Sequence, residues 1–483
     1  MKTKSIKLNI MFNAFRTGMS MIFPVISFSY SSRILSPTGL GQVQFSQSII
    51  SYFILIAMLG VNNYGIREGA KIRDSKEQLT KFFAELLSLN LFSTIIAYCL
   101  FFVALFTIPE LKDYKELLLI FSTTILGTAL GVEWFYGAIE EYGYIAIRSF
   151  IFQIVSLVFL LTFVKTREDV WKYAVIQAFA TVGSNVINFF HVRKYINGYH
   201  LSFQIKKHIK PVLVLFIMAL TISLYVSMDS TMLGFLANDY EVGLYSAAVK
   251  VNKIVVHVLD SIGIVLLPRL SYYYENKEFN NFNRLVYKTV HYLLFLAIPA
   301  TFGLGLLSKE ILNLFSGSEY HSAIITMQIL TPIVTIIPLN TVINNQIFLP
   351  MNKEKWVLFS TSASAVTNLI GNFILIPHFY RNGAAIATVL AETAGLIICL
   401  LYASRIFDIK QLFVNIWQYL LGAILMIPIS VIIKNIFDNE IIHIFLIVPL
   451  CMIEYFLVLL LLKNENAYEI IGYVRKIISR KKE

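Results

Sequence analysis

The chain has 483 residues, of which 57% are hydrophobic and only 14% are charged, and its mean hydropathy is +0.69. This composition excludes a soluble globular protein and indicates an integral membrane protein. The net charge of +11 is best explained by basic cytoplasmic loops facing anionic lipid headgroups, so nucleic-acid binding is not implied.

Windows of roughly 20 apolar residues, long enough to cross a bilayer core of about 30 Å, recur along the chain. We therefore predict an all-α integral membrane fold of about fourteen transmembrane helices. Their approximate ranges are 9–32, 40–65, 82–108, 114–139, 142–165, 170–192, 211–236, 240–269, 286–308, 322–349, 356–379, 382–404, 411–434 and 439–462. The three cysteines lie within these spans without disulfide or metal-ligand spacing, so we expect no metal site and no cofactor.

The basic residues outside the spans are distributed unequally between the two sides of the membrane. If the N-terminus is cytoplasmic, 28 of the 40 Lys and Arg fall in inner segments and nine in outer segments. The positive-inside rule then places both termini in the cytoplasm. The three basic residues that remain are Arg16, Lys250 and Lys253. Because Arg16 interrupts the first apolar stretch, we expect a retained span there and not a cleaved signal sequence.

Two short segments indicate an internal repeat. The segments 34–43 and 235–244 align with an offset near 200 residues, which equals six spans. We predict two six-helix lobes in a pseudo-two-fold repeat, followed by two additional C-terminal helices. The predicted parts are an N-terminal lobe (1–192), a basic cytoplasmic linker (193–210), a C-terminal lobe (211–404), an appended helix pair (405–462) and a basic cytoplasmic tail (463–483).

The eighth predicted span carries a charged face. Lys250 lies about 15 Å from its outer end, at about 1.5 Å per residue, which is near the bilayer midplane. A charge at that depth is costly unless it meets water, a partner or a substrate. Two interpretations are open: a buried ion-pair cluster to which Asp229 of the seventh span adds a carboxylate, or a water-filled cavity. The face consists of Ser246, Lys250, Lys253, His257, Asp260 and Ser261.

The first predicted span repeats this pattern. Asn13 and Arg16 share one face with several Ser and Asn residues, which favours a cavity lining. Arg16 is also close enough to the cytoplasmic end to reach lipid headgroups by snorkelling.

Glu133 and Arg148 lie equally far from the midpoint of the short turn near Glu140 and Glu141. A helical hairpin would therefore bring them to the same depth. We expect them to pair, and a direct contact of Arg148 with substrate is the alternative.

The tenth predicted span contains Pro332 and Pro338 together with several amides, a pattern typical of a kinked helix. The kink is either a hinge or a static feature. Glu392, near the middle of the twelfth span, either binds a proton or cation or accepts a hydrogen bond.

The sequence shows no ATPase motif, no phosphate-binding loop, no nucleophile elbow and no metal-binding cluster, so we do not expect an enzyme. The predicted outer loops are all short, which disfavours a membrane polymerase.

Six stretches resemble the bacterial oligosaccharide repeat-unit flippases, the O-antigen and capsule transporters of the multidrug/oligosaccharidyl-lipid/polysaccharide exporter superfamily. They extend from the second to the twelfth span, and the last two spans carry no matching motif. The stretches are 64–74, 133–140 with Arg148, 229–236, 242–248, 267–271 and 383–392.

The resemblance implies a transporter in the bacterial cytoplasmic (inner) membrane that moves undecaprenyl-pyrophosphate-linked oligosaccharides to the outer leaflet by alternating access. In this hypothesis Arg16 and Arg269 admit the diphosphate, and Lys250 and Lys253 hold it near the midplane. A proton or cation gradient would act through Asp229, His257, Asp260 or Glu392. Anionic lipids and a polysaccharide polymerase and chain-length complex are the other expected partners. The alternatives are an ion-coupled multidrug antiporter of the same superfamily and a non-enzymatic component of a glycan assembly complex.

Overall fold

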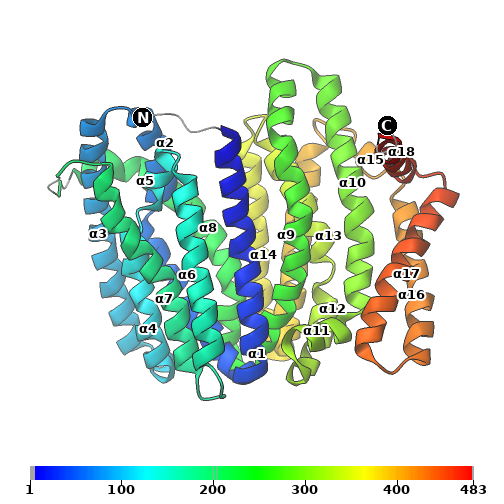
Figure 1. Cartoon of the computed structure of the whole chain (residues 1–483), viewed down its shortest axis with the longest axis horizontal. Helices are drawn as coiled ribbons and strands as arrows, with labels where there is room; N and C mark the ends of the chain where they lie inside the picture. The colour runs from blue at the N-terminus through cyan, green and yellow to red at the C-terminus, as the bar shows by residue number, and fades with distance from the viewer. Residues whose placement is uncertain (1–5, 199–200, 203, 481–483) are drawn as a thin grey trace. The chain divides into compact units, whose positions relative to one another are not determined.

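The computed structural model describes residues 6–198, 201–202 and 204–480, which are helical with no β-strand among them (Figure 1). Ten helices in this part of the chain are long and apolar enough to span a membrane, and a bent pair, Ser318–Leu330 with Ile333–Phe348, would raise the number to eleven. The predicted all-α membrane architecture is confirmed, whereas the number of fourteen spans is not.

Two of the long helices are each built from two arms. Helix α1 (Ile6–Met58) turns at Ser36, where φ is 64°, and α14 (Glu354–Ala403) turns at Tyr380, where φ is 50°. Left-handed φ is unfavourable for a residue with a side chain, so each of these residues marks a sharp turn. Each long helix therefore covers two of the predicted spans.

The chain forms two compact units, residues 1–243 and 244–483. The first contains α1, α2 (Val61–Ile72), α3 (Lys76–Thr107), η1 (Pro109–Tyr114), α4 (Lys115–Leu130), α5 (Glu133–Ala138), α6 (Tyr142–Phe163), α7 (Val170–His191), η2 (Val192–Lys194) and α8 (Ile205–Leu236). Helix α9 (Asp239–Glu275) begins in the first unit and continues in the second.

The second unit completes α9 and adds the remaining helices. They are α10 (Phe279–Leu306), α11 (Ser308–Ser316), η3 (Ser318–Ala323), α12 (Ile324–Leu330), α13 (Ile333–Thr341), the π-helical η4 (Val342–Phe348), α14, α15 (Ile409–Leu412), α16 (Ile416–Ile436), α17 (Glu440–Leu461) and α18 (Glu465–Arg480).

The boundary between the units lies later in the chain than the predicted linker, because α8 packs against α1. Ser51 Oγ donates a hydrogen bond to Ser227 Oγ at 3.0 Å, and Thr231 Oγ1 donates to Ser48 Oγ at 2.9 Å. The predicted linker is also partly helical, since α8 begins at Ile205. Its His208 is buried between Tyr64 and Glu85, with contacts of 2.9 and 2.8 Å.

The two segments of the predicted repeat contact each other within the N-terminal unit. A Cβ added to Gly41 would lie 1.8 Å from the carbonyl oxygen of Asp239, and one added to Gly243 would lie 1.9 Å from that of Pro37. Each glycine thus faces the backbone of the residue four positions before the other glycine. The contact joins the two segments of the predicted repeat, and the repeat itself stays a prediction.

Two of the stretches that carry the family resemblance pack together at one end of this unit. Gly65 of α2 lies so close to Trp134 of α5 that an added Cβ would be 2.6 Å from its ring, and Arg73 forms an ion pair with Glu140 at 2.5 Å. Trp134 and the following Phe135 are fully buried. This apolar contact fixes the start of α5, where Glu133 lies.

The tenth predicted span is broken, as its prolines and amides indicated. Helix α12 ends at Leu330, and the chain then bends by 48° into α13. After α13 the chain continues as the π-helix η4. Such breaks free backbone groups and amides for contacts with neighbouring helices. Asn340 donates to Glu392 Oε2 at 3.2 Å, and Asn344 Oδ1 accepts a hydrogen bond from Ser360 at 3.2 Å. The kink is confirmed; a hinge motion stays a prediction.

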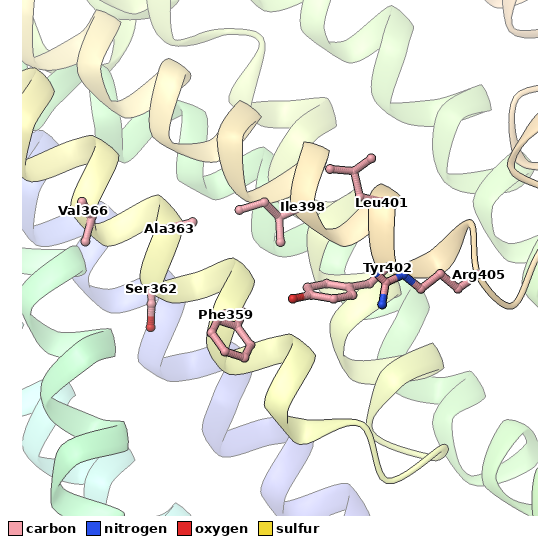
Figure 2. A pocket seen from close by; sticks show the side chains of 8 residues that line it. All are labelled: Phe359, Ser362, Ala363, Val366, Ile398, Leu401, Tyr402 and Arg405. Atoms are coloured by element: carbon pink, nitrogen blue, oxygen red, sulfur yellow. The ribbon is translucent and has the colours of Figure 1, made fainter.

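The two arms of α14 lie beside each other and leave a groove between them, lined by residues of both arms and by Arg405 just beyond the helix (Figure 2).

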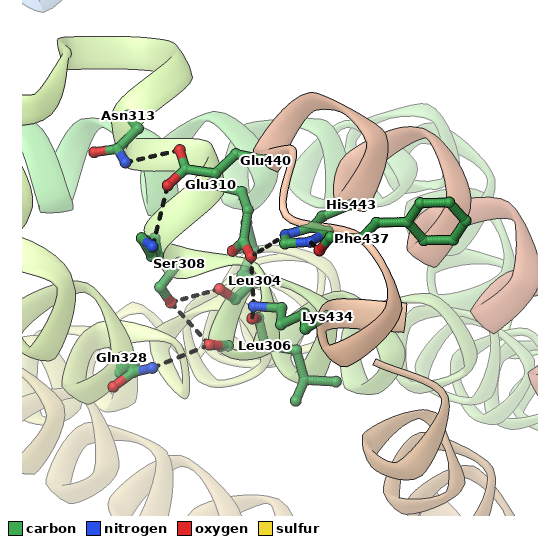
Figure 3. A network of polar contacts seen from close by, with 12 residues as sticks. Leu304, Leu306, Ser308, Glu310, Asn313, Gln328, Lys434, Phe437, Glu440 and His443 are labelled. Atoms are coloured by element: carbon green, nitrogen blue, oxygen red, sulfur yellow. Dashed lines mark hydrogen bonds and ion pairs between the residues drawn. The ribbon is translucent and has the colours of Figure 1, made fainter. Parts of the chain in front are cut away.

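The helix pair α16–α17 shares the apolar core of the C-terminal unit. Tyr455 of α17, for example, donates a hydrogen bond to the carbonyl of Phe295 in α10 at 2.9 Å. At one end, the buried carboxylate of Glu310 in α11 meets Lys434 of α16 at 2.6 Å and His443 of α17 at 3.0 Å (Figure 3). Although the sequence predicted an appended pair, these helices are integrated into the unit.

The predicted C-terminal tail also contains a packed helix. Lys288 and Tyr292 of α10 both donate hydrogen bonds to Glu469 of α18, and these bonds hold the pKa of that carboxyl below its usual value. The tail is therefore anchored to α10 through its first turns.

Candidate functional site

A cavity of about 570 Å³ lies inside the N-terminal unit, and nine of its fourteen lining residues have polar side chains. Its volume is within the range of small-molecule sites. Helices α1, α4, α5, α6, α7 and α8 and the start of α2 contribute to it. The lining residues are Leu55, Met58, Gly60, Asn62, Asn63, Thr128, Glu133, Ser149, Gln153, Ala180, Thr181, Ser184, Asn185 and Ala219.

Glu133, which lines this cavity, contacts two arginines. Arg148 Nη2 lies 3.2 Å from Glu133 Oε1, which confirms the predicted pairing, and Arg16 Nη1 lies 3.6 Å from Oε2. The Glu133 side chain is 43% exposed, whereas that of Arg148 is only 5% exposed. One carboxylate thus faces two guanidinium groups, which leaves a local excess of one positive charge.

Arg148 keeps unused hydrogen-bonding capacity. Its Nη2 also donates to Ser149 Oγ at 3.3 Å, but its buried Nε and Nη1 have no hydrogen-bond partner among the residues that the structure describes. Buried donors without partners are uncommon and costly. An anionic group entering the cavity next to Ser149 would find a guanidinium that Glu133 satisfies only in part.

A second, smaller cavity of about 180 Å³ shares Thr181 with the first. On its wall Gln47 of α1 donates a hydrogen bond to Gln177 of α7 at 2.9 Å. Gln47 and Gln177 are not among the site residues predicted from the sequence. The spacing of Gln177, Thr181 and Ser184 on one face of α7 is the signal that would have found them.

The charged face predicted for the eighth span lies on α9. Lys250 and Lys253 are partly exposed, His257 is exposed, and Asp260 bonds Thr341 of α13. Among the residues that the structure describes, no carboxylate oxygen lies within 4.0 Å of the amine of Lys253 or of the ring nitrogens of His257. The buried ion-pair interpretation therefore finds no support at Lys253.

The remaining predicted residues are distributed over several elements. Asp229 is buried in α8, within the N-terminal unit. Arg269 is exposed on α9, donates a hydrogen bond to Tyr273 at 2.9 Å and lies over its ring. Glu392 is buried and accepts a hydrogen bond from Asn340. The side chain of Asn13 lies outside the described residues.

No group of three or more His, Cys, Asp or Glu side chains within the described ranges is placed to hold a metal ion.

Comparison with known proteins gives two family matches. The family described as polysaccharide biosynthesis protein matches residues 6–274, and the MatE family matches residues 215–374. The first match covers more than half of the chain.

Curated relatives and solved structures agree with these matches. The chain is 23% identical over 393 residues, 80% of its length and 94% of the relative's, to a protein of Escherichia coli (strain K12) named putative O-antigen transporter. A Haloferax volcanii protein named probable low-salt glycan biosynthesis flippase is 26% identical over 51% of this chain and 52% of its own.

The fold resembles that of a lipid II flippase in an inward closed conformation, with a TM-score of 0.72, 18% identity and coverage of 96% and 100% of the two chains. An inward-facing multidrug transporter matches with a TM-score of 0.61 and 13% identity over 82% of this chain and 97% of its own. The chain belongs to the polysaccharide biosynthesis protein family and is a membrane transporter of the multidrug/oligosaccharidyl-lipid/polysaccharide exporter superfamily, not an enzyme.

Proposed function

We propose that the protein flips undecaprenyl-pyrophosphate-linked oligosaccharide repeat units from the cytoplasmic to the outer leaflet of the bacterial cytoplasmic membrane by alternating access. The observation that carries this proposal is the pair of arginines, Arg16 and Arg148, that contact Glu133, a residue lining a cavity within the membrane-spanning part of the N-terminal unit. The relatives named as an O-antigen transporter and as a glycan flippase support the same substrate class.

The residue chemistry fits such a cargo. A diphosphate needs cations, and guanidinium groups bind phosphate through paired hydrogen bonds. Arg16 and Arg148 offer these groups in the N-terminal unit, and Lys250 and Lys253 offer ammonium groups on α9. Sugar hydroxyls need donors and acceptors, which the amides and hydroxyls of the cavity wall provide.

Within this proposal Arg269 and Asn13 contact the entering lipid-linked glycan, and Pro332 and Pro338 act as the hinge of the tenth span. Asp229, His257, Asp260 and Glu392 are the candidate groups for coupling a proton or cation gradient, since they are the titratable side chains that accompany the cationic residues in the spans. A polysaccharide polymerase and chain-length complex would receive the cargo on the outer side.

The test is complementation of a strain that lacks this gene and retains its glycan pathway. Lys250→Gln, Lys253→Gln and Arg16→Gln are compared with Lys112→Gln, which removes an exposed cation on η1. Surface polysaccharide is measured against the amount of membrane-inserted protein. Because one charge-assisted hydrogen bond to phosphate contributes about tenfold or more in affinity, we expect each of the three variants to lower glycan output while Lys112→Gln does not.

The leaflet on which single lipid-linked repeat units accumulate distinguishes a flippase from a polymerase. A flippase defect leaves single repeat units on the cytoplasmic leaflet, whereas a polymerase defect leaves them on the outer leaflet. Normal glycan output from all three variants at normal abundance would contradict the proposal. Normal output after every charge within the membrane is neutralised would indicate a scaffold in place of a transporter.

The match of residues 215–374 to the MatE family favours one second candidate, an ion-coupled antiporter of small molecules. Purified protein in liposomes distinguishes the two functions, because an antiporter moves a cationic dye against an imposed proton or sodium gradient and a flippase moves a fluorescent lipid-linked glycan.

A further inference from the structure

The groove between the two arms of α14 is a second site, in the C-terminal unit. It has a volume of about 500 Å³ and opens on the surface of a helix that is apolar enough to span the membrane. Phe359 and Leu401 on its two sides are 60% and 62% exposed. The lining residues are Phe359, Ser362, Ala363, Val366, Ile398, Leu401, Tyr402 and Arg405 (Figure 2). An apolar groove with this exposure faces lipid.

Two cations and two aromatic rings form a stack at one end of the groove. The Arg405 guanidinium lies 5.2 Å from the centre of the Tyr402 ring, which stacks on Trp356 at 5.0 Å and an interplanar angle of 11°. The Lys353 ammonium lies 5.1 Å from the Trp356 ring, and the edge-on contact of Phe348 with Trp356, at 5.3 Å, fixes that ring. The rings thus hold the Arg405 guanidinium at the groove and the Lys353 ammonium against Trp356, the next ring of the stack.

These charges are not neutralised by neighbouring carboxylates. Among the described residues, no carboxylate oxygen lies within 4.0 Å of Arg405 or Lys353, and no carboxylate lines the groove. Arg405 retains the planar set of donors that suits phosphate. Arg405 would therefore complement an anion at the mouth, and the apolar side chains of the groove would complement an alkyl chain.

The length of the groove indicates which part of an amphiphilic ligand it contacts. From Phe359 to Val366 the groove follows seven residues, about 10 Å at 1.5 Å per residue, so it contacts only the first part of a chain. A site of this length recognises the charged headgroup and not the identity of the tail. The positive-inside rule places Lys353 and Arg405 at the cytoplasmic surface, where anionic phospholipids attract basic residues.

We propose that this groove binds one anionic phospholipid of the cytoplasmic leaflet, with its phosphate on Arg405 and the start of an acyl chain between Phe359 and Leu401. The site is separate from the cavity of the N-terminal unit and does not depend on the nature of the transported cargo. It assigns a defined position to one of the anionic lipids that the basic loops were expected to attract.

The test uses the purified full-length protein in phosphatidylcholine nanodiscs to which phosphatidylglycerol is added, with bound lipid counted by native mass spectrometry after release. Arg405→Gln removes the phosphate contact, and Ala363→Phe fills the groove while leaving the charges in place. Arg193→Gln is the matched control, because Arg193 also lies over an aromatic ring, that of Phe190, at 5.4 Å. Thermal denaturation verifies that each variant is folded.

We expect one phosphatidylglycerol per wild-type chain above the level of the nonspecific lipid shell. Its affinity should fall about tenfold or more in Arg405→Gln, as for the loss of a charge-assisted hydrogen bond, and also in Ala363→Phe, and it should persist in Arg193→Gln. Unchanged binding in folded Arg405→Gln protein, or equal retention of phosphatidylcholine, would overturn the proposal.

Two competition arms separate the other sources of phosphate. Displacement by inorganic phosphate at millimolar concentration would show that the site binds a free anion and not a lipid. A preference of more than about tenfold for undecaprenyl phosphate over phosphatidylglycerol would show that the groove selects the carrier lipid, which would also overturn the assignment.

Discussion

At the residue scale, this transporter has few charged residues within its spans, and its chemistry depends on what each of them contacts. Glu133 is shared by Arg148 and Arg16 on the wall of a cavity. The position of Glu133 and Arg148 on either side of a short turn was enough to predict their pairing. The contact of Arg16 with the same carboxylate needs the packing of α1 against α6 and could not be derived from spacing.

Removing Glu133 should destabilise the protein more than removing the whole pair. Glu133→Gln leaves Arg148 buried without a counter-charge, which costs about 3 kcal/mol in a fully buried site and less here because Glu133 is 43% exposed. Thermal denaturation in detergent should give a lower midpoint for Glu133→Gln than for wild type. In the double variant Glu133→Gln/Arg148→Gln the midpoint should recover in part; an additive loss would show that the two residues do not interact.

The reciprocal glycines give a second prediction at this scale. Gly41→Ala and Gly243→Ala place a methyl group within 2 Å of a backbone oxygen, 1.8 and 1.9 Å respectively, so the two segments must separate. We expect a strong loss of folded protein in each variant, measured by size-exclusion chromatography of a fluorescent fusion. Gly303→Ala is the control, because a Cβ at Gly303 meets nothing within 4 Å and alanine is the better helix former. Monodisperse Gly41→Ala protein at wild-type yield would disprove the close contact.

At the scale of elements, the polar residues at helix ends and breaks determine how the helices assemble. Glu310 connects α11 to both helices of the α16–α17 pair. Both ring nitrogens of His443 lie within hydrogen-bonding distance of oxygens, Glu310 Oε1 at 3.0 Å and the carbonyl of Phe437 at 2.7 Å. Lys434 and His443 thus share a single buried carboxylate.

Replacing that carboxylate should loosen the helix pair. Glu310→Gln removes the charge that both Lys434 and His443 face, and breaking a buried ion pair costs about 3 kcal/mol. We expect a lower denaturation midpoint and faster proteolysis between α16 and α17. Glu440→Gln serves as the control, because its partner Lys309 is 49% exposed and exposed ion pairs contribute little. Equal effects of the two substitutions would show that Glu310 is not the anchor.

At the scale of the whole molecule, the number of basic residues on each side of the spans predicts orientation. We expect a cysteine at Lys277, in the turn between α9 and α10, to react with a membrane-impermeant maleimide only after the cells are permeabilised. A cysteine at Ser318, in η3, should react in intact cells, in a Cys99→Ser background that removes an exposed thiol. The reverse pattern would place both termini outside and contradict the positive-inside assignment.

The division into units shows a limit of the sequence at this scale. Hydropathy placed α8 at the start of the second lobe, yet contacts assign it to the first unit. The reason is side-chain packing: Phe45 of α1 fits against Gly234 and Phe235 of α8. The helices α16–α17 likewise carry no recognisable motif, but their apolar side chains complete the core around α10.

The sequence by itself determined the membrane-spanning helical class, the family resemblance, the break at Pro332 and the Glu133–Arg148 pair. Each of these follows from hydrophobicity, local spacing or backbone chemistry, which act along the chain. Only the tertiary structure decided that Arg16 joins Glu133, that Gln47 meets Gln177, and that Lys353, Trp356, Tyr402 and Arg405 form one stack. These contacts join residues that lie far apart in the chain. Which faces meet depends on how the helical segments rotate and pack, and apolar sequences do not specify this.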